Sequence, residues 1–141
     1  MARKSLYTVI TLLFLFVVSI NLQAQGQPSV SVSASKKSFS PGENGVLLIK
    51  FKTGPKVKIP KEPGVEVISI SGVNGGNLQG VGGAGEYIES KLVKYNFTVP
   101  SDAAPGSTIK VTGSVKFGYC NSDDGVCKLG KSNFTANIKV K

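Results

Sequence analysis

The sequence predicts an all-β protein, an immunoglobulin-like β-sandwich of about seven to nine strands. Apolar residues alternate with polar ones in short runs, and no stretch shows the 3.6-residue period of an amphipathic helix. Glycine and proline interrupt these runs at residues 40–42, 54–55 and 62–64, where they are typical of turns. Short alternating strands at this spacing are characteristic of an immunoglobulin-like sandwich.

Six strands can be placed along the chain from this alternation. They are expected at residues 30–34, 46–52, 65–70, 87–99, 108–119 and 133–140. Side chains two positions apart on a strand share one face of the sheet. Val111, Val115 and Phe117 are therefore expected to face the same core as Phe134 and Ile138.

Two segments depart from regular strands. Residues 72–85 contain seven glycines, and we expect a mobile loop there. This segment lacks the lysine and the following helix that a phosphate-binding loop requires, which argues against a nucleotide site. Residues 56–61 combine lysines with a proline, as in a short edge strand that is protected against pairing with other chains.

The N-terminus has the pattern of a secretory signal peptide. Arg3 and Lys4 precede an apolar run over residues 6–20, and Leu22-Gln23-Ala24 ends in a small residue suited to cleavage. The run is shorter than the roughly 20 residues that cross a membrane, so an uncleaved anchor is the less favoured alternative. We expect a signal peptide at residues 1–24, one domain at residues 25–141 and no membrane insertion after cleavage.

Composition excludes most familiar chemistries. The formal net charge is +9, but the lysines are scattered along the expected strands and Trp is absent, which argues against a nucleic-acid surface. There is no His in the chain. Imidazole bases, His-dependent catalytic triads and most transition-metal sites are therefore excluded.

The cysteine pair is the most informative feature of the sequence. Cys120 and Cys127 are the only cysteines, and they flank the polar stretch at residues 121–126. In an oxidising compartment we expect them to form a disulfide. The bond would close so small a loop that chain entropy supplies at most about 2.5 kcal/mol. Two interpretations remain at this point: a structural clip on a hairpin, or a bond that takes part in chemistry.

The residues around the pair resemble a known family. The run Val-Thr-Gly-Ser-Val-Lys-Phe-Gly-Tyr-Cys at residues 111–120, followed by Asp-Gly-Val-Cys at 124–127, is similar to the N-terminal periplasmic domain of the thiol:disulfide interchange protein DsbD. Thr-Val-Pro at 98–100 and Ala-Pro-Gly at 104–106 also resemble that family. Six residues separate the cysteines here, against five in the best-known members, and Lys-Leu-Gly at 128–130 replaces their Tyr-Pro-Pro.

The resemblance implies an immunoglobulin-like domain that shuttles electrons through its two cysteines and requires neither a metal nor an organic cofactor. Cys127 corresponds to the cysteine that forms mixed disulfides, and Cys120 to the one that resolves them. Tyr87 falls on the loop that caps the disulfide in the family, and Glu86 stands where a capping Phe is expected. Tyr119 precedes the first cysteine and is a further candidate for the surroundings of the bond.

The implied setting is the periplasm, where a stand-alone monomeric module would exchange electrons with separate proteins. Thioredoxin-like proteins and a membrane electron donor of the DsbD or CcdA type are the partners that the resemblance implies. The alternative from a different class is an exported immunoglobulin-like binding or structural module whose hairpin disulfide is inert. The reduction potential separates the two, because an inert bridge lies below about −300 mV.

Overall fold

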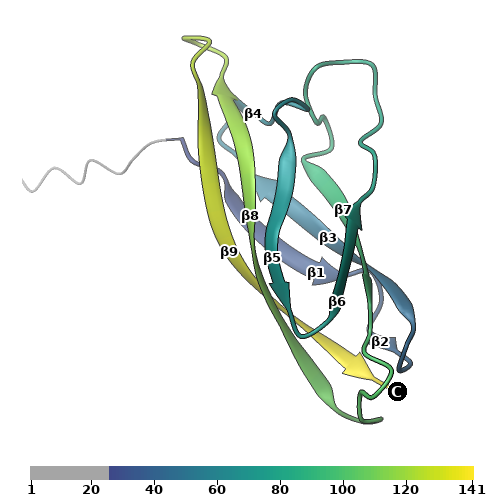
Figure 1. Ribbon diagram of the computed structural model, residues 1–141. Helices are drawn as coiled ribbons and strands as arrows, with labels where there is room; N and C mark the ends of the chain where they lie inside the picture. The colour runs from purple at the N-terminus through teal and green to yellow at the C-terminus, as the bar shows by residue number, and fades with distance from the viewer. Residues whose placement is uncertain (1–25) are drawn as a thin grey trace, which may run out of the picture.

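Alternating apolar and polar residues form two β-sheets in the computed structural model, which describes residues 26–141 (Figure 1). The signal peptide expected at residues 1–24 lies outside the described residues. The strands are β1 (Ser29–Ala34), β2 (Ser38–Phe39), β3 (Asn44–Lys52), β4 (Val57–Lys58), β5 (Val65–Ser71), β6 (Asn74–Leu78), β7 (Leu92–Thr98), β8 (Thr108–Asn121) and β9 (Cys127–Val140). None of residues 26–141 forms a helix that is long and apolar enough to cross a membrane.

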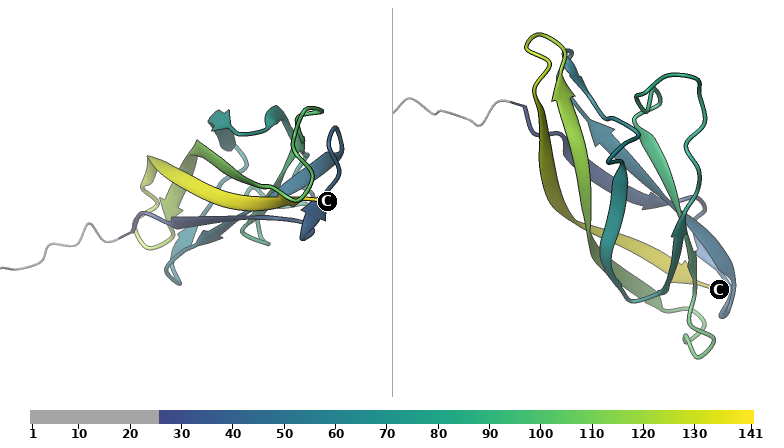
Figure 2. Two further views of the ribbon diagram at one scale, coloured as in Figure 1. Left: turned by 90° about the horizontal axis from the view of Figure 1, so that it is seen from below. Right: turned by 45° about the horizontal axis from the view of Figure 1, so that its top comes forward.

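The strand order is that of an immunoglobulin-like sandwich. One sheet has the order β1-β3-β7-β6, and the other has the order β2-β9-β8 with β4 and β5 both pairing with β8. In the second sheet β2 runs parallel to β9, whereas β4, β5 and β9 are all antiparallel to β8. Figure 2 shows the two sheets as stacked layers. If the two-residue strands β2 and β4 are left out, one sheet holds the first, second, fifth and fourth of the remaining seven strands, and the other sheet holds the third, sixth and seventh. This is the immunoglobulin arrangement, so the predicted fold class is confirmed.

The core lies between the two sheets and is formed by the alternate side chains of the long strands. Phe117 of β8 packs edge-on against Phe51 of β3, with ring centroids 5.0 Å apart, and so connects the sheets. Phe39 makes a similar contact with Phe97 at 5.3 Å. The residues expected to share one core face are all buried, namely Val111, Val115, Phe117, Phe134 and Ile138.

Most predicted strands are confirmed, but their ends differ. Strands β8 and β9 are longer than expected because they pair continuously from Thr108 opposite Lys139 to Cys120 opposite Cys127. The strand predicted at residues 87–99 is shorter, since β7 begins at Leu92. The expected edge strand at residues 56–61 is β4, which pairs along one edge of β8.

The prediction of a mobile loop across residues 72–85 is wrong in its first half. Residues 74–78 form β6, the edge strand of the first sheet, which pairs with β7. A Cβ atom on Gly75 would lie 2.7 Å from the Tyr95 hydroxyl, and one on Gly76 would lie 2.7 Å from the carbonyl oxygen of Asn96. The two glycines permit a close approach between neighbouring strands. The prediction took the glycines only as a sign of a loop.

Candidate functional site

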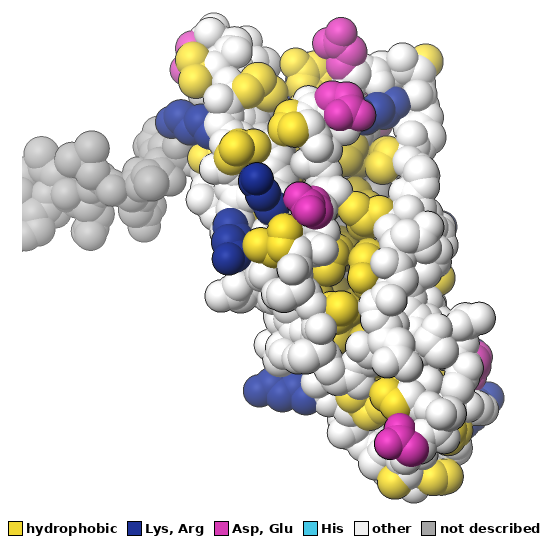
Figure 3. All heavy atoms as spheres, in the orientation of Figure 1, with side chains coloured by type: hydrophobic (Ala, Val, Ile, Leu, Met, Phe, Trp, Pro, Cys, Tyr) yellow, Lys and Arg dark blue, Asp and Glu magenta, His cyan; other side chains and the backbone are white. Residues whose placement is uncertain are grey.

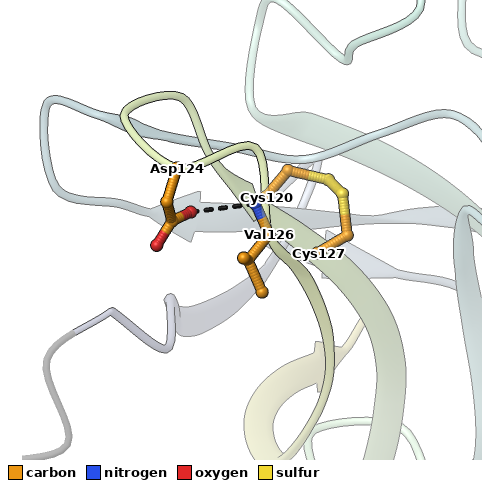
Figure 4. The surroundings of a disulfide bond; sticks show 4 residues. All are labelled: Cys120, Asp124, Val126 and Cys127. Carbon is orange, nitrogen blue, oxygen red and sulfur yellow. Dashed lines mark hydrogen bonds between the residues drawn. A yellow bond between two sulfur atoms is a disulfide. The ribbon is translucent and has the colours of Figure 1, made fainter.

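The two cysteines are bonded to each other across the end of the β8–β9 hairpin (Figure 4). Cys120 and Cys127 are directly opposed in the strand register, with their Cα atoms 4.0 Å apart and their sulfur atoms 2.07 Å apart. Both belong to one sheet, so the bond does not connect the two layers as the disulfide of an antibody domain does. The expected disulfide is therefore confirmed, and it staples only a hairpin.

The hairpin loop is closed by its own hydrogen bonds. The backbone N–H of Asn121 donates to the Val126 carbonyl at 3.0 Å, and that of Gly125 donates to the Asn121 carbonyl at 2.9 Å. The Asn121 side chain accepts from the N–H of Asp123 at 2.9 Å, and the Asp124 carboxylate accepts from the N–H of Val126 at 2.8 Å (Figure 4). These short local bonds favour the turn whether or not the sulfurs are joined.

The same loop is tethered to the residue before β4. The backbone N–H and the hydroxyl of Ser122 both donate to the carbonyl of Lys56, at 2.8 and 3.0 Å. The Lys56 ammonium also lies 2.7 Å from the Asp123 carboxylate, although both side chains are exposed and such pairs contribute little. The tether fixes the position of β4 against the cysteine-bearing end of β8, where Lys58 stands opposite Cys120.

The two cysteines differ sharply in exposure. Cys120 is only 5% exposed, on β8 between its neighbours β4 and β9. Cys127 is exposed at the start of β9. An incoming thiolate must reach one sulfur in line with the S–S bond. The arrangement therefore favours attack at Cys127, with Cys120 as the leaving sulfur.

A groove of about 530 Å³ runs beside the disulfide. It is lined by Pro60, Lys61, Glu62, Pro63, Glu86, Tyr87, Gly118, Cys120, Cys127, Lys128 and Leu129. The structure thus brings Tyr87 and Glu86 to the same groove as both cysteines. Two prolines of the groove pack closely against Gly118 of β8. A Cβ atom on Gly118 would lie 3.2 Å from Pro60 and 3.4 Å from Pro63.

Tyr87 is held in the groove by backbone pairing. The N–H of Lys61 donates to the carbonyl of Glu86 at 2.8 Å, and the N–H of Ile88 donates to that of Ile59 at 2.8 Å. Tyr87 is consequently the bridge partner of Pro60. Directly opposed residues of antiparallel strands point to the same face. Since Pro60 is two positions from Lys58, Tyr87 shares a face with Cys120.

Tyr119 lies elsewhere. It precedes Cys120 on β8, and successive side chains on a strand point to opposite faces. Its ring packs toward the core, with its centroid 6.2 Å from that of Phe117, and it does not line the groove. Tyr119 therefore supports the sheet from the face opposite the disulfide.

Several residues of the groove were not anticipated from the sequence. They are Pro60, Pro63, Gly118 and Leu129, which all line it. Leu129 is 62% exposed and Val126 is 49% exposed, so the hairpin end presents two large apolar side chains to solvent. Figure 3 shows exposed apolar side chains at this end of the molecule, interspersed with charged ones. The signal for Gly118 and Leu129 is their spacing of two from Cys120 and Cys127, which places them on the same face.

Within residues 26–141, no three His, Cys, Asp or Glu side chains gather into a group that could hold a metal ion. Thiol–disulfide exchange needs a sulfur that a thiolate can reach and a leaving thiolate, and it needs no metal. The groove and the exposed Cys127 meet the first requirement.

Replacing Tyr87 with Ala should accelerate reduction of the disulfide by a small thiol several-fold. The half-buried ring forms one wall of the groove, and its removal opens the approach to the sulfurs. The protein is reduced with dithiothreitol, the reaction is quenched at set times, and the free thiols of the protein are counted. Tyr119→Leu, on the opposite face, is the matched control. Equal rates for Tyr87→Ala and the unaltered protein would show that Tyr87 does not limit access.

No protein-family model matches the chain, and comparison with curated proteins gives no match. Among solved structures, the chain is similar to the sixth cohesin of scaffoldin B from Acetivibrio cellulolyticus, solved in complex with a mutant Cel5 dockerin. The two are 20% identical, the alignment covers 79% of this chain and 99% of the cohesin, and the TM-score is 0.38. So distant a likeness carries no argument about function, and the immunoglobulin-like fold is assigned here from the strand order.

Proposed function

We propose that this chain is an exported thiol–disulfide exchange module that relays electrons through Cys120 and Cys127. Its donor would be a thioredoxin-like protein or a membrane protein of the DsbD or CcdA type, and its acceptors would be other exported oxidoreductases. The observation that carries the proposal is the unequal exposure of the two cysteines in a hairpin that its own hydrogen bonds already close. A bond needed only as a clip has no use for an accessible groove beside it.

The exchange follows from this geometry in two displacements. A donor thiolate forms a bond to the Cys127 sulfur, and the electron pair of the broken S–S bond leaves on Cys120 as a thiolate. A second donor thiol then attacks the mixed disulfide and releases Cys127, so that the donor is oxidised and the module reduced. In the forward relay, the Cys127 thiolate attacks an acceptor disulfide and Cys120 displaces the reduced acceptor.

The surface around the bond supports docking of a protein rather than a small thiol alone. Leu129 exposes its apolar side chain in the lining of the groove with Cys127, and the exposed Pro63 lines the same groove. Exposed apolar residues that cluster at one place mark interaction sites in soluble proteins. A partner that covers them would bring its own thiol to the exposed cysteine. Location in the periplasm, and the resemblance to the N-terminal domain of DsbD, belong to the same proposal.

The test is transfer of electrons from a protein donor. Oxidised protein mixed with one equivalent of a reduced thioredoxin-like protein should lose its disulfide in a substantial fraction of molecules, as counted by alkylation and mass spectrometry. The Cys120→Ser/Cys127→Ser double variant supplies the background for this count. A disulfide that stays fully oxidised at equilibrium would instead assign the chain to the class of exported immunoglobulin-like modules with an inert bridge.

A further inference from the structure

The cation nearest in strand register to the sulfur that leaves in this exchange is Lys58. It is the cross-strand partner of Cys120 in the pairing of β4 with β8. Side chains in such a pair share a face, with Cβ atoms roughly 4.5–5.5 Å apart, which a lysine spans easily. In the oxidised protein the Lys58 ammonium lies over the ring of Tyr87, 5.2 Å from its centroid. Tyr87 itself lines the groove with both cysteines.

The leaving sulfur needs a counter-charge. Cys120 is 5% exposed, and burial disfavours the charged thiolate over the neutral thiol. A thiolate that is poorly stabilised is also a poor leaving group in disulfide exchange. A cation beside Cys120 would offset both effects.

The charged and titratable groups near the disulfide from each neighbouring element are Lys58, Lys61, Glu62, Glu86, Tyr87, Asp123, Asp124 and Lys128. The two glutamates carry the wrong sign to stabilise a thiolate. Lys61 donates to the carbonyl of Gly83 at 2.6 Å, and Asp123 lies in an ion pair with Lys56. Lys128 lines the groove, but in the strand register it is opposite Tyr119 and not opposite Cys120. Of these lysines, Lys58 is the one whose register places it directly opposite Cys120.

We propose that Lys58 is the group that neutralises the Cys120 thiolate when the disulfide breaks, and that the Tyr87 ring holds its ammonium nearby while the bond is intact. This inference rests on the proposed exchange. The donor sulfur bonds to Cys127, the electron pair of the S–S bond passes to Cys120, and the negative charge moves from the donor to a site beside Lys58. The lysine remains an ammonium throughout, so the step requires no proton transfer.

The test measures the midpoint pH at which the Cys120 thiol ionises to the thiolate. Three proteins that carry Cys127→Ser are compared: one that keeps Lys58, one with Lys58→Met and one with Lys58→Arg. For each protein, the ultraviolet absorbance of the single thiolate is measured as a function of pH. Removing an adjacent positive charge should raise the midpoint pH by about one unit, and Lys58→Arg should restore it. Lys116→Met, a lysine on the same face of β8 but farther along the strand, should leave the midpoint unchanged. Because Lys58 is exposed, the difference should shrink in high salt.

A second readout uses the intact cysteine pair and no protein partner. Lys58→Met should slow reduction by dithiothreitol about threefold at neutral pH, because the leaving thiolate is then less stable. Lys58→Gln repeats both measurements with a different neutral side chain, so that a folding defect in one variant does not decide the result. Identical midpoints and rates for wild type and both neutral variants would overturn the role of Lys58. A shifted midpoint in a protein that no thioredoxin-like donor reduces would support this role and refute the relay.

Discussion

A Cys120→Ser variant is expected to accumulate a covalent adduct with a thioredoxin-like protein whose own resolving cysteine has been removed. Cys127 is the exposed member of the pair and is free to form the mixed disulfide, whereas the buried Cys120 that would release it is absent. Removing a resolving thiol traps the intermediate of an exchange that passes through an intermolecular bond. The adduct should appear on a non-reducing gel and disappear on addition of reductant.

The matched variant is Cys127→Ser, which leaves only the buried thiol. It should form the adduct at least tenfold less, because Cys120 is buried and offers a partner little surface. Equal trapping by the two variants would refute the assignment of roles to the sulfurs. Trapping by Cys127→Ser alone would reverse that assignment, with Cys120 as the attacking group.

Phe117→Ala should lower the free energy of unfolding by about 3–5 kcal/mol, the usual cost of truncating a fully buried phenylalanine. Phe117 is 1% exposed and joins the two sheets through its contact with Phe51. The Cys120→Ser/Cys127→Ser double variant should lose no more than about 2.5 kcal/mol, since the bond closes only a short hairpin. Urea denaturation followed by circular dichroism gives both values.

The comparison decides what holds the sandwich together. Phe117→Leu serves as the control, because it keeps most of the buried apolar surface and should cost less than Phe117→Ala. The double serine variant should retain the β-sheet spectrum of the oxidised protein at room temperature. If it unfolds, or loses more stability than Phe117→Ala, the disulfide is structural and the relay proposal loses its main support.

The alternation of side chains was sufficient to predict the sandwich and its core, because the apolar residues of each strand identify the face that is buried. This is why Val115 and Phe117 on β8 were placed correctly against Phe134 and Ile138 on β9. The first residues of β9 were missed since they follow no apolar alternation. Their strand conformation comes from pairing with β8, which is a tertiary interaction.

The site was predictable only in part, because tertiary pairing between strands also determines which residues meet at it. The disulfide follows from two close cysteines, and the position of Tyr87 beside it was suggested by a resemblance and not by the chain's own pattern. Placing Tyr119 on the opposite face needed only strand parity, which the sequence contains. The position of Lys58 opposite Cys120, by contrast, depends on how β4 registers against β8 across a long loop. No local pattern specifies that register.

The reduction potential of the Cys120–Cys127 bond tests the central claim most directly. It is obtained by equilibrating the protein with a thioredoxin-like protein of known potential and measuring the reduced fraction of each by mass after alkylation. A relay should lie within the range of working exchange proteins, between about −120 and −270 mV, where electrons pass readily in and out. A potential below about −300 mV would mark an inert structural bridge and would contradict the account.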